Sequence, residues 1–126
     1  MFIQIQPHSD TPIYIQLTQQ IIEGIVNKDI EPGESLPSVR TLAADLGVNM
    51  HTVNKSYHEL EKKGLITIIP KSGAIVNVPR KMGNANAEQL DYMEKMLRPV
   101  VAEGIVQGLG MNDFEKLIKR LMKTLY

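Results

Sequence analysis

Two short helical patterns separated by only two residues constrain this chain more than any other feature. Residues 38–46 place apolar side chains at the i, i+3, i+4 and i+7 spacing of an amphipathic helix. Gly47 follows, where a helix C-terminus favours a left-handed residue. Asn49 then suits the N-cap of a second helix over residues 50–63. A connection made only of Gly47 and Val48 predicts a helix-turn-helix.

The helix expected over residues 50–63 has two different faces. At about 100° per residue, its apolar positions Val53, Tyr57 and Leu60 fall together, which predicts a core face. Hydrogen-bond donors fall on the opposite side. A polar stripe of this kind is by default a solvated face, but opposite a core face on the second helix of a helix-turn-helix it is better explained by contact with DNA. The stripe consists of His51, Lys55, His58 and Lys62.

A β-hairpin is expected after these helices. Residues 65–69 and 74–78 are rich in β-branched side chains, and the turn-like sequence PKSG lies between them. This arrangement places Lys71 at the tip. Earlier in the chain, alternation over residues 3–6 suggests a short strand, and a first helix is expected from Pro12 to about Lys28.

The C-terminal part predicts two further helices after a polar linker over residues 80–87. One covers about residues 87–107, and the last begins after Asn112, with Glu115 completing a loose capping box. The fold expected is therefore mainly α with a small β-hairpin. A winged helix-turn-helix domain over residues 1–79 is followed by a two-helix tail over residues 80–126.

Composition excludes several classes of protein. Without cysteine the chain has neither disulfides nor thiolate metal sites. It shows no signal-peptide pattern and no apolar run near the roughly 18 residues of a membrane span, so we expect a cytoplasmic protein without a membrane partner. His51 and His58 are seven positions apart, but no nearby acidic residue completes a metal site. No phosphate loop or catalytic set is evident, and we expect no enzyme activity and no cofactor.

Charge is distributed unevenly between the two parts of the chain. The net charge is zero, from 14 basic and 14 acidic residues. Residues 1–79 hold six Lys or Arg and eight Asp or Glu, whereas residues 80–126 hold eight and six. Nucleic-acid-binding domains are usually basic. If the first part binds DNA, it does so through the local placement of its charges.

Four segments, in this order, resemble the DNA-binding domain of GntR-type bacterial transcription regulators. They are PIYIQLTQQII, EPGESLPSVRTLAADLGV, NMHTVNKSYHELEKKGLI and SGAIV, and together they cover about residues 10–78. LPSVR and TVNKSYHELEKKGLI are the most specific parts. The short tail is similar to that of the YtrA-type branch, whose members use two helices for dimerisation.

The resemblance implies roles for individual residues. Arg40 would read a base or a phosphate, Ser38 would contact a phosphate as well as cap its helix, and Lys71 would meet a phosphate or the minor groove. Met50 and Asn54 stand where relatives often carry arginine, which implies a changed base preference. The complete set of expected DNA-binding residues is Ser38, Arg40, Asn49, Met50, His51, Thr52, Asn54, Lys55, Lys71 and Ser72.

The expected function is a sequence-specific transcription regulator, a repressor, that binds double-stranded DNA as a homodimer on a two-fold operator. A winged-helix module that binds another protein and does not read DNA is the alternative, and the acidic balance of residues 1–79 favours it. The sequence does not show whether a small-molecule effector exists. The tail is too short to enclose a pocket of roughly 300–1,000 Å³ by itself, so we expect no dedicated effector domain, and any small molecule would bind at the dimer interface. The residues expected at the dimer interface are Leu97, Phe114, Leu117, Ile118, Leu121 and Leu125.

Overall fold

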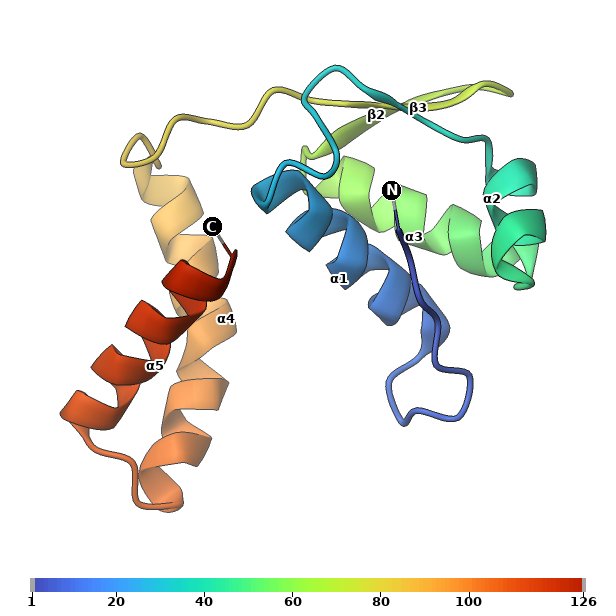
Figure 1. Ribbon diagram of the computed structural model, residues 1–126. Coiled ribbons are helices and arrows are strands. Elements are labelled where there is room, and N and C mark those ends of the chain that lie inside the picture. Colours follow the sequence, from blue (N-terminus) through green and yellow to red (C-terminus); the bar gives the residue numbers. More distant parts are fainter. Residues whose placement is uncertain (1, 126) are drawn as a thin grey trace. The chain divides into compact units, whose positions relative to one another are not determined.

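The computed structural model describes residues 2–125 and divides the chain into two compact units (Figure 1). We call Met1–Pro79 the N-terminal unit and Arg80–Tyr126 the tail unit. Among the described residues, helices predominate and the strands form one small sheet. The prediction of a mainly α fold with a small β-hairpin is therefore confirmed.

The three helices of the N-terminal unit are α1 over Ile13–Val26, α2 over Val39–Leu46 and α3 over Met50–Lys62. Gly47 ends α2 in the left-handed conformation, with φ of 68°. The Asn49 side-chain oxygen accepts a hydrogen bond of 2.7 Å from a backbone amide at the start of α3. The helix-turn-helix expected from the spacing is confirmed.

The sheet has three antiparallel strands in the order β1-β3-β2. They are β1 over Ser35–Leu36, β2 over Ile66–Ile69 and β3 over Gly73–Val76. The β2–β3 hairpin is the predicted wing, whereas β1 was not predicted, because two residues are too few to show a period. Strand β3 therefore lies at the centre of the sheet and is paired on both sides.

Gly73 makes the central position of β3 possible. Its φ is 91°, and a Cβ atom added there would lie 2.2 Å from the carbonyl oxygen of Leu36. Only glycine allows the backbone of β1 to approach this closely. Gly73 therefore allows β3 to lie against β1, the strand that leads into α2.

The core of the N-terminal unit lies between its three helices and the sheet. Tyr57, predicted as a core residue, has no exposed surface, and its hydroxyl donates a hydrogen bond of 2.7 Å to the carbonyl oxygen of Pro37. Two other buried hydroxyls, those of Thr18 on α1 and Ser56 on α3, share a hydrogen bond of 2.8 Å. The apolar core consists of Leu17, Ile21, Ile30, Leu36, Leu42, Ala43, Val53, Tyr57, Leu60, Ile66, Ala74 and Val76.

The strand predicted over residues 3–6 is wrong. This segment forms no sheet pairing and instead lies along α1, where two glutamine side chains bind its backbone. Gln20 accepts from the amide of Gln4 at 2.9 Å and donates to the carbonyl oxygen of the same residue at 2.8 Å. Gln16 binds Gln6 in the same way, at 2.9 and 3.0 Å. A side-chain amide carries both a donor and an acceptor, so each glutamine binds the backbone N–H and C=O groups that a neighbouring strand would otherwise bind.

The tail unit consists of α4 over Ala87–Val106 and α5 over Met111–Leu125. A capping box starts α4: the Asn86 side chain accepts from the amide of Gln89, and the Gln89 side chain accepts from the amide of Asn86, both at 2.9 Å. The two helices approach closely at Gly104, where an added Cβ atom would lie 2.7 Å from Cζ of Phe114.

The cap predicted for the last helix is wrong. Helix α5 begins at Met111, so Asn112 lies inside its first turn. The carbonyl oxygen of Gly110 accepts from the amides of Asp113 and Phe114, and the Asp113 carboxylate accepts from the Gly110 amide at 2.8 Å. Asp113, rather than Glu115, therefore satisfies the free amide at the helix start, two positions earlier than the sequence pattern indicated.

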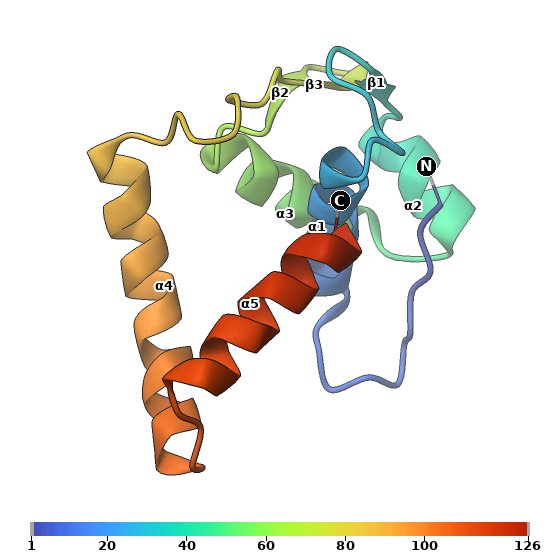
Figure 2. The same cartoon turned by 60° about the vertical axis from the view of Figure 1, so that its left-hand side comes forward.

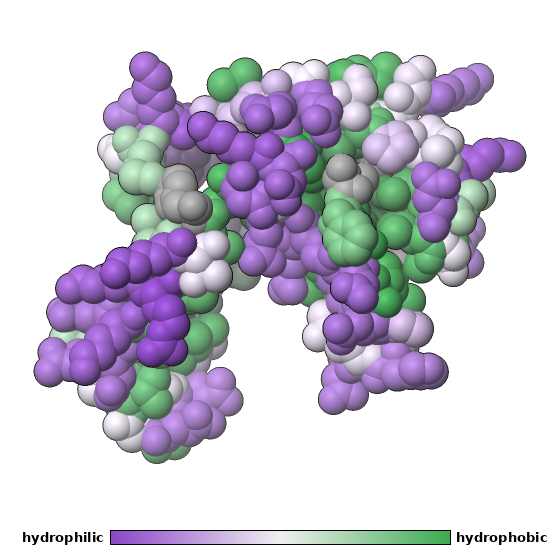
Figure 3. Space-filling view, in the orientation of Figure 1, coloured by the Kyte–Doolittle hydropathy of each residue, from purple (hydrophilic) through white to green (hydrophobic). Residues whose placement is uncertain are grey.

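Large apolar side chains are exposed in the tail unit. Gly104 is the only residue of α4 that is buried, and none of α5 is buried among the residues described. Hydrophobic side chains reach the surface beside hydrophilic ones on the face drawn in Figure 3. No helix within residues 2–125 combines the length and apolar character needed to cross a membrane.

Candidate nucleic-acid interface

The start of α2 holds two of the expected DNA-binding residues. The Ser38 hydroxyl oxygen accepts a hydrogen bond of 3.1 Å from the amide of Thr41 and donates one of 2.9 Å to its hydroxyl. Ser38 therefore caps the helix, as one of the two expectations for it required. Arg40 is exposed on the first turn, and none of residues 2–125 forms an ion pair with it.

Thr41 is a candidate that the sequence reasoning missed. It is exposed, and its hydroxyl accepts the Ser38 proton, so its own proton remains available to an outside acceptor. The sequence offered a weak signal, since threonine follows the LPSVR segment directly. The pair thus presents one free hydroxyl donor beside Arg40 at this helix end.

The start of α3 presents the next group. Asn49 uses its side-chain oxygen in the cap, which leaves its NH₂ group to donate elsewhere. Met50, on the first helical position, is 44% exposed. His51 and Asn54 are exposed, and Thr52 is half-buried. The exposed apolar side chain of Met50 therefore stands among hydrogen-bond donors.

The polar stripe along α3 is exposed throughout, at His51, Lys55, His58 and Lys62. Within it, the Lys55 ammonium nitrogen lies 4.1 Å from the centroid of the Tyr14 ring on α1. This distance is that of a cation–π interaction. Tyr14 was not expected at this surface, because nothing in the local sequence pattern shows that the start of α1 reaches the middle of α3.

The wing tip is a tight turn closed by a hydrogen bond of 3.0 Å from the amide of Ser72 to the carbonyl oxygen of Ile69. Lys71 occupies its third position with φ of 66°, and both Lys71 and Ser72 are exposed. Proline followed by a residue with positive φ is typical of a type II turn. In Figures 1 and 2 the free end of this hairpin lies toward the α2 side of the unit.

Glu61 links α3 to the wing through a hydrogen bond. The sequence did not indicate this role. Its carboxylate accepts a hydrogen bond of 2.8 Å from the amide of Ile68, on the outer edge of β2. A free strand edge otherwise leaves such amides to water or to another chain. The angle between the wing and the polar stripe of α3 is thereby restrained.

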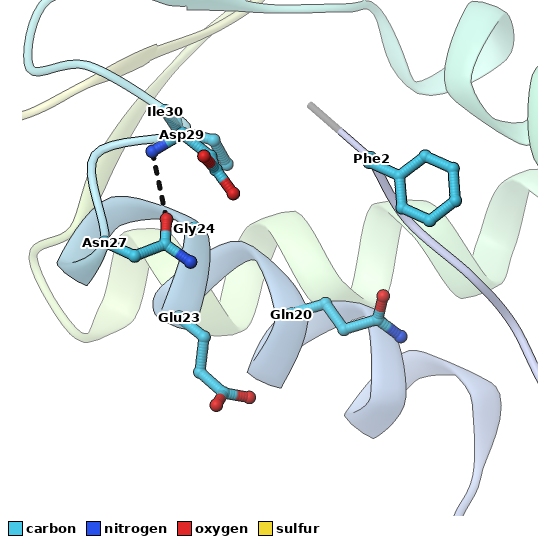
Figure 4. A pocket seen from close by; sticks show the side chains of 7 residues that line it. All are labelled: Phe2, Gln20, Glu23, Gly24, Asn27, Asp29 and Ile30. Carbon is cyan, nitrogen blue, oxygen red and sulfur yellow. Dashed lines mark hydrogen bonds between the residues drawn. The ribbon is translucent and has the colours of Figure 1, made fainter. Parts of the chain in front are cut away.

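The surface at the C-terminal end of α1 is acidic, in contrast to the polar stripe of α3. A shallow hollow of about 210 Å³ lies there, with Phe2, Glu23 and Asp29 in its lining (Figure 4). The amide of Asp29 donates to the Asn27 side chain at 3.0 Å, which closes the turn after the helix. Two carboxylates repel phosphate, so this hollow is unsuited to DNA.

The structure carries no arrangement typical of a metal centre in the part that it describes. Within residues 2–125, no three His, Asp or Glu side chains converge on one point. Burial raises the pKa of Tyr57 to about 12, but its hydroxyl is bound to Pro37 and belongs to the core. What the unit presents on its surface is a set of hydrogen-bond donors and fixed cations from α2, α3 and the wing.

Comparison with known proteins identifies this arrangement. The family described as bacterial regulatory proteins, gntR family, matches residues 13–76, just over half of the chain. The HTH-type transcriptional repressor YtrA of Bacillus subtilis is 32% identical over 119 residues, which cover 94% of this chain and 91% of that protein.

Solved structures agree with this match. A protein titled transcriptional antiterminator, from Listeria monocytogenes, has a TM-score of 0.84 and 26% identity over 99% of this chain and 92% of its own. YtrA from Sulfolobus acidocaldarius, a GntR-family transcription factor, has a TM-score of 0.66 and 37% identity over 84% and 99%. AraR(DBD) in complex with operator ORX1 has a TM-score of 0.52 and 28% identity over 60% and 95%.

Proposed function

Because this chain belongs to the GntR family of bacterial regulatory proteins, we propose that it is a homodimeric transcriptional repressor that binds a two-fold DNA operator. Membership makes it a transcriptional regulator and not an enzyme, since its relatives are named as regulators and repressors. The homodimer, the operator symmetry and repression are the parts that we propose.

One observation carries the DNA-binding part of the proposal. Arg40 on α2, the polar stripe on α3 and Lys71 on the wing are all exposed, and they belong to three elements of one winged helix-turn-helix. In such folds the second helix enters the major groove with its N-terminal residues on base edges. The AraR domain of the same fold is in complex with an operator, which supports DNA as the partner here.

Residue chemistry separates base reading from backbone binding. Arg40 is the only arginine before residue 80, so it is the candidate for bidentate contact with guanine. Met50 offers only an apolar contact, for example to a thymine methyl group. Asn49, His51 and Asn54 add hydrogen bonds to bases, whereas the remaining expected residues hold the phosphates: Ser38, Thr52, Lys55, Lys71 and Ser72.

The tail unit supports the homodimer. Leu97, Ile118 and Leu121 are about half exposed, at 47%, 51% and 52%. Full burial of an exposed side chain of this size stabilises by roughly 1.5–3 kcal/mol, so covering the exposed half of each supplies about half of that. A second copy of the tail is the partner that we propose for this surface. A two-fold dimer then requires two half-sites near one helical turn apart, or a multiple of that.

Binding to DNA fragments selected from genomic DNA tests the proposal, at low and at moderate salt. Affinity for a selected fragment should fall steeply as salt rises, because each phosphate contact releases counterions. Binding that is absent at both salt concentrations would favour the protein-interaction module, the alternative supported by the two excess acidic residues of the N-terminal unit.

Two substitutions then distinguish base reading from phosphate binding. Arg40→Ala should cost about 1–3 kcal/mol on the selected operator and relax one base position. Lys71→Ala should weaken all sequences alike and reduce the salt slope by about one. An unchanged affinity and base profile for Arg40→Ala would remove this residue from the reading surface.

The same proposal places the protein in the cytoplasm, where the DNA is, and any small-molecule effector at the interface between two tails. The tail offers two helices, which are too few to enclose a pocket of roughly 300–1,000 Å³ within one subunit. A metabolite that copurifies with a monomeric variant of the full chain would contradict this location.

A further inference from the structure

Lys55 differs from the other residues of the polar stripe, because an aromatic ring from another helix lies beneath its charge. The ammonium nitrogen is 4.1 Å from the centroid of the Tyr14 ring. Its neighbours His51 and His58 are exposed without such a contact among the described residues. Tyr14 belongs to the first turn of α1, far from α3 in the sequence.

The backbone of Tyr14 is linked to α3 through two hydrogen bonds of Thr18, one part-buried and one buried. The carbonyl oxygen of Tyr14 accepts a hydrogen bond of 2.6 Å from the Thr18 hydroxyl. That hydroxyl also shares a buried hydrogen bond of 2.8 Å with Ser56, the residue that follows Lys55. Tyr14 is itself half-buried. The start of α1, which carries the ring, is therefore held against α3 next to Lys55.

The contact leaves the ammonium group able to donate. A ring face attracts the charge without using a particular N–H as a hydrogen-bond partner, and lysine has three. A lysine that is free in water samples many rotamers and loses that freedom when it binds a phosphate. Holding the group in advance reduces this loss.

We propose that Tyr14 is a positioning residue that holds the Lys55 ammonium group for contact with a phosphate of the DNA backbone. This inference rests on the proposed DNA-binding function. Tyr14 acts through Lys55, so loss of the ring matters only while the lysine is present. An exposed cation–π contact corresponds to about a twofold to fivefold change in affinity.

A double-mutant cycle on the full-length chain tests the coupling. Operator affinity is measured for Tyr14→Leu, Lys55→Ala and the double variant, with Tyr14→Phe as the control that keeps the ring. We expect Tyr14→Leu to weaken binding about twofold to fivefold, Tyr14→Phe to leave it unchanged, and Tyr14→Leu to have no further effect in the Lys55→Ala background. Thermal unfolding checks that each variant folds, and Tyr14→Met replaces Tyr14→Leu if that variant does not.

A spectroscopic measurement gives a readout that does not depend on DNA. The ring current of Tyr14 should move the Lys55 ε-methylene protons upfield in the NMR spectrum of the free protein. The shift should persist in Tyr14→Phe and disappear in Tyr14→Leu. Its absence in the unsubstituted protein would overturn the inference, whatever the DNA measurements show.

The outcomes also separate this inference from the proposed function. Equal losses from Tyr14→Leu with and without Lys55 would mean that Tyr14 acts only through the fold, and tighter binding would mean that the ring competes with the phosphate. Either result overturns the inference and leaves DNA binding intact. If the unsubstituted protein binds no DNA, the proposed function fails and the positioning role fails with it.

Discussion

The two units of this protein use their apolar residues in opposite ways. The N-terminal unit buries Leu17, Ile21 and Leu60 completely and closes a core of its own. The tail unit also places leucines on helices but leaves Leu90, for example, 62% exposed. The difference lies in the number of layers, since three helices and a sheet enclose side chains that two helices alone cannot cover.

The N-terminal unit therefore uses its apolar residues to fold, and we propose that the tail unit uses its apolar residues to assemble with a partner. The N-terminal unit has what it needs to fold by itself, whereas the apolar surface of the tail needs a partner, for which we have proposed a second copy. The same division extends to charge, since the N-terminal unit holds two more acidic than basic residues and the tail holds two more basic than acidic ones. The predictions below test the contrast, from the largest expected effect to the smallest.

A matched pair of leucine truncations tests the contrast directly. Leu17→Ala should lower the free energy of unfolding of the N-terminal unit by about 2–5 kcal/mol, because it opens a cavity in a closed core. Leu117→Ala removes the same atoms from a side chain that is 38% exposed and should change that free energy by less than about 1 kcal/mol. Amide hydrogen exchange, read separately for α3 and α5, measures both. Similar losses in α3 from the two changes would contradict the contrast.

Adding a charge to the tail tests the assembly. Leu121→Asp should weaken self-association by about 2–4 kcal/mol, since it removes an apolar contact and places a carboxylate in the interface. Asn112→Asp adds the same charge to an exposed position of the same helix and serves as the control. Light scattering over a concentration series gives the result. A monomer for the unsubstituted chain at tens of micromolar would disprove the proposed dimer.

The core of the N-terminal unit should also respond to alkaline pH through Tyr57. Burial raises the pKa of its phenol to about 12, so the folded state keeps a proton that the unfolded state loses near pH 10. The corresponding stability is fully present below pH 10 and is lost as the pH rises to 12, by roughly 2–3 kcal/mol in all. Unfolding at pH 9 and 11 measures about half of this loss, roughly 1–1.5 kcal/mol. Tyr57→Phe, which also gives up the hydrogen bond to Pro37, should lack this component, and an unchanged pH dependence would contradict its assignment to Tyr57.

The smallest effect concerns the start of the tail. Asn86→Ala removes the capping box of α4 and should cost about 0.5–2 kcal/mol of local stability. Hydrogen exchange at the amides of Gln89 and Leu90 should accelerate, while exchange in α3 stays as it was. A change in α3 of the same size would show that the two units do not unfold independently.

Much of the fold was predictable, because its signals are local. The periods of α1 to α5, the glycine after α2 and the Asn49 cap each depend on residues within one or two turns of each other. Prediction failed where two possible helix caps were neighbours in the sequence, or where a segment binds residues that are distant in the sequence. Asn112 is a good N-cap residue, but the Asp113 carboxylate accepts from the Gly110 amide, and the helix therefore begins two positions earlier than the Asn112 cap required.

The residues of the candidate DNA interface also fall into those that the sequence predicted and those that it did not. Exposure of Arg40, His51 and Lys71 followed from their places opposite a core face or at a turn. Thr41 and Glu61 were missed, since a hydroxyl and a carboxylate on helix surfaces resemble ordinary solvated positions until their hydrogen bonds are seen.

The sequence alone determined the five helices and the β2–β3 hairpin, their order and the core faces of the N-terminal unit, because helix and turn signals depend on spacing along the chain. Only the tertiary structure decided which distant side chains meet. It placed Gln16 on the backbone of Gln6, Tyr57 on Pro37 and Tyr14 beneath Lys55. These contacts depend on how whole elements pack, and a period in the sequence records which face is buried but not which residue lies opposite it.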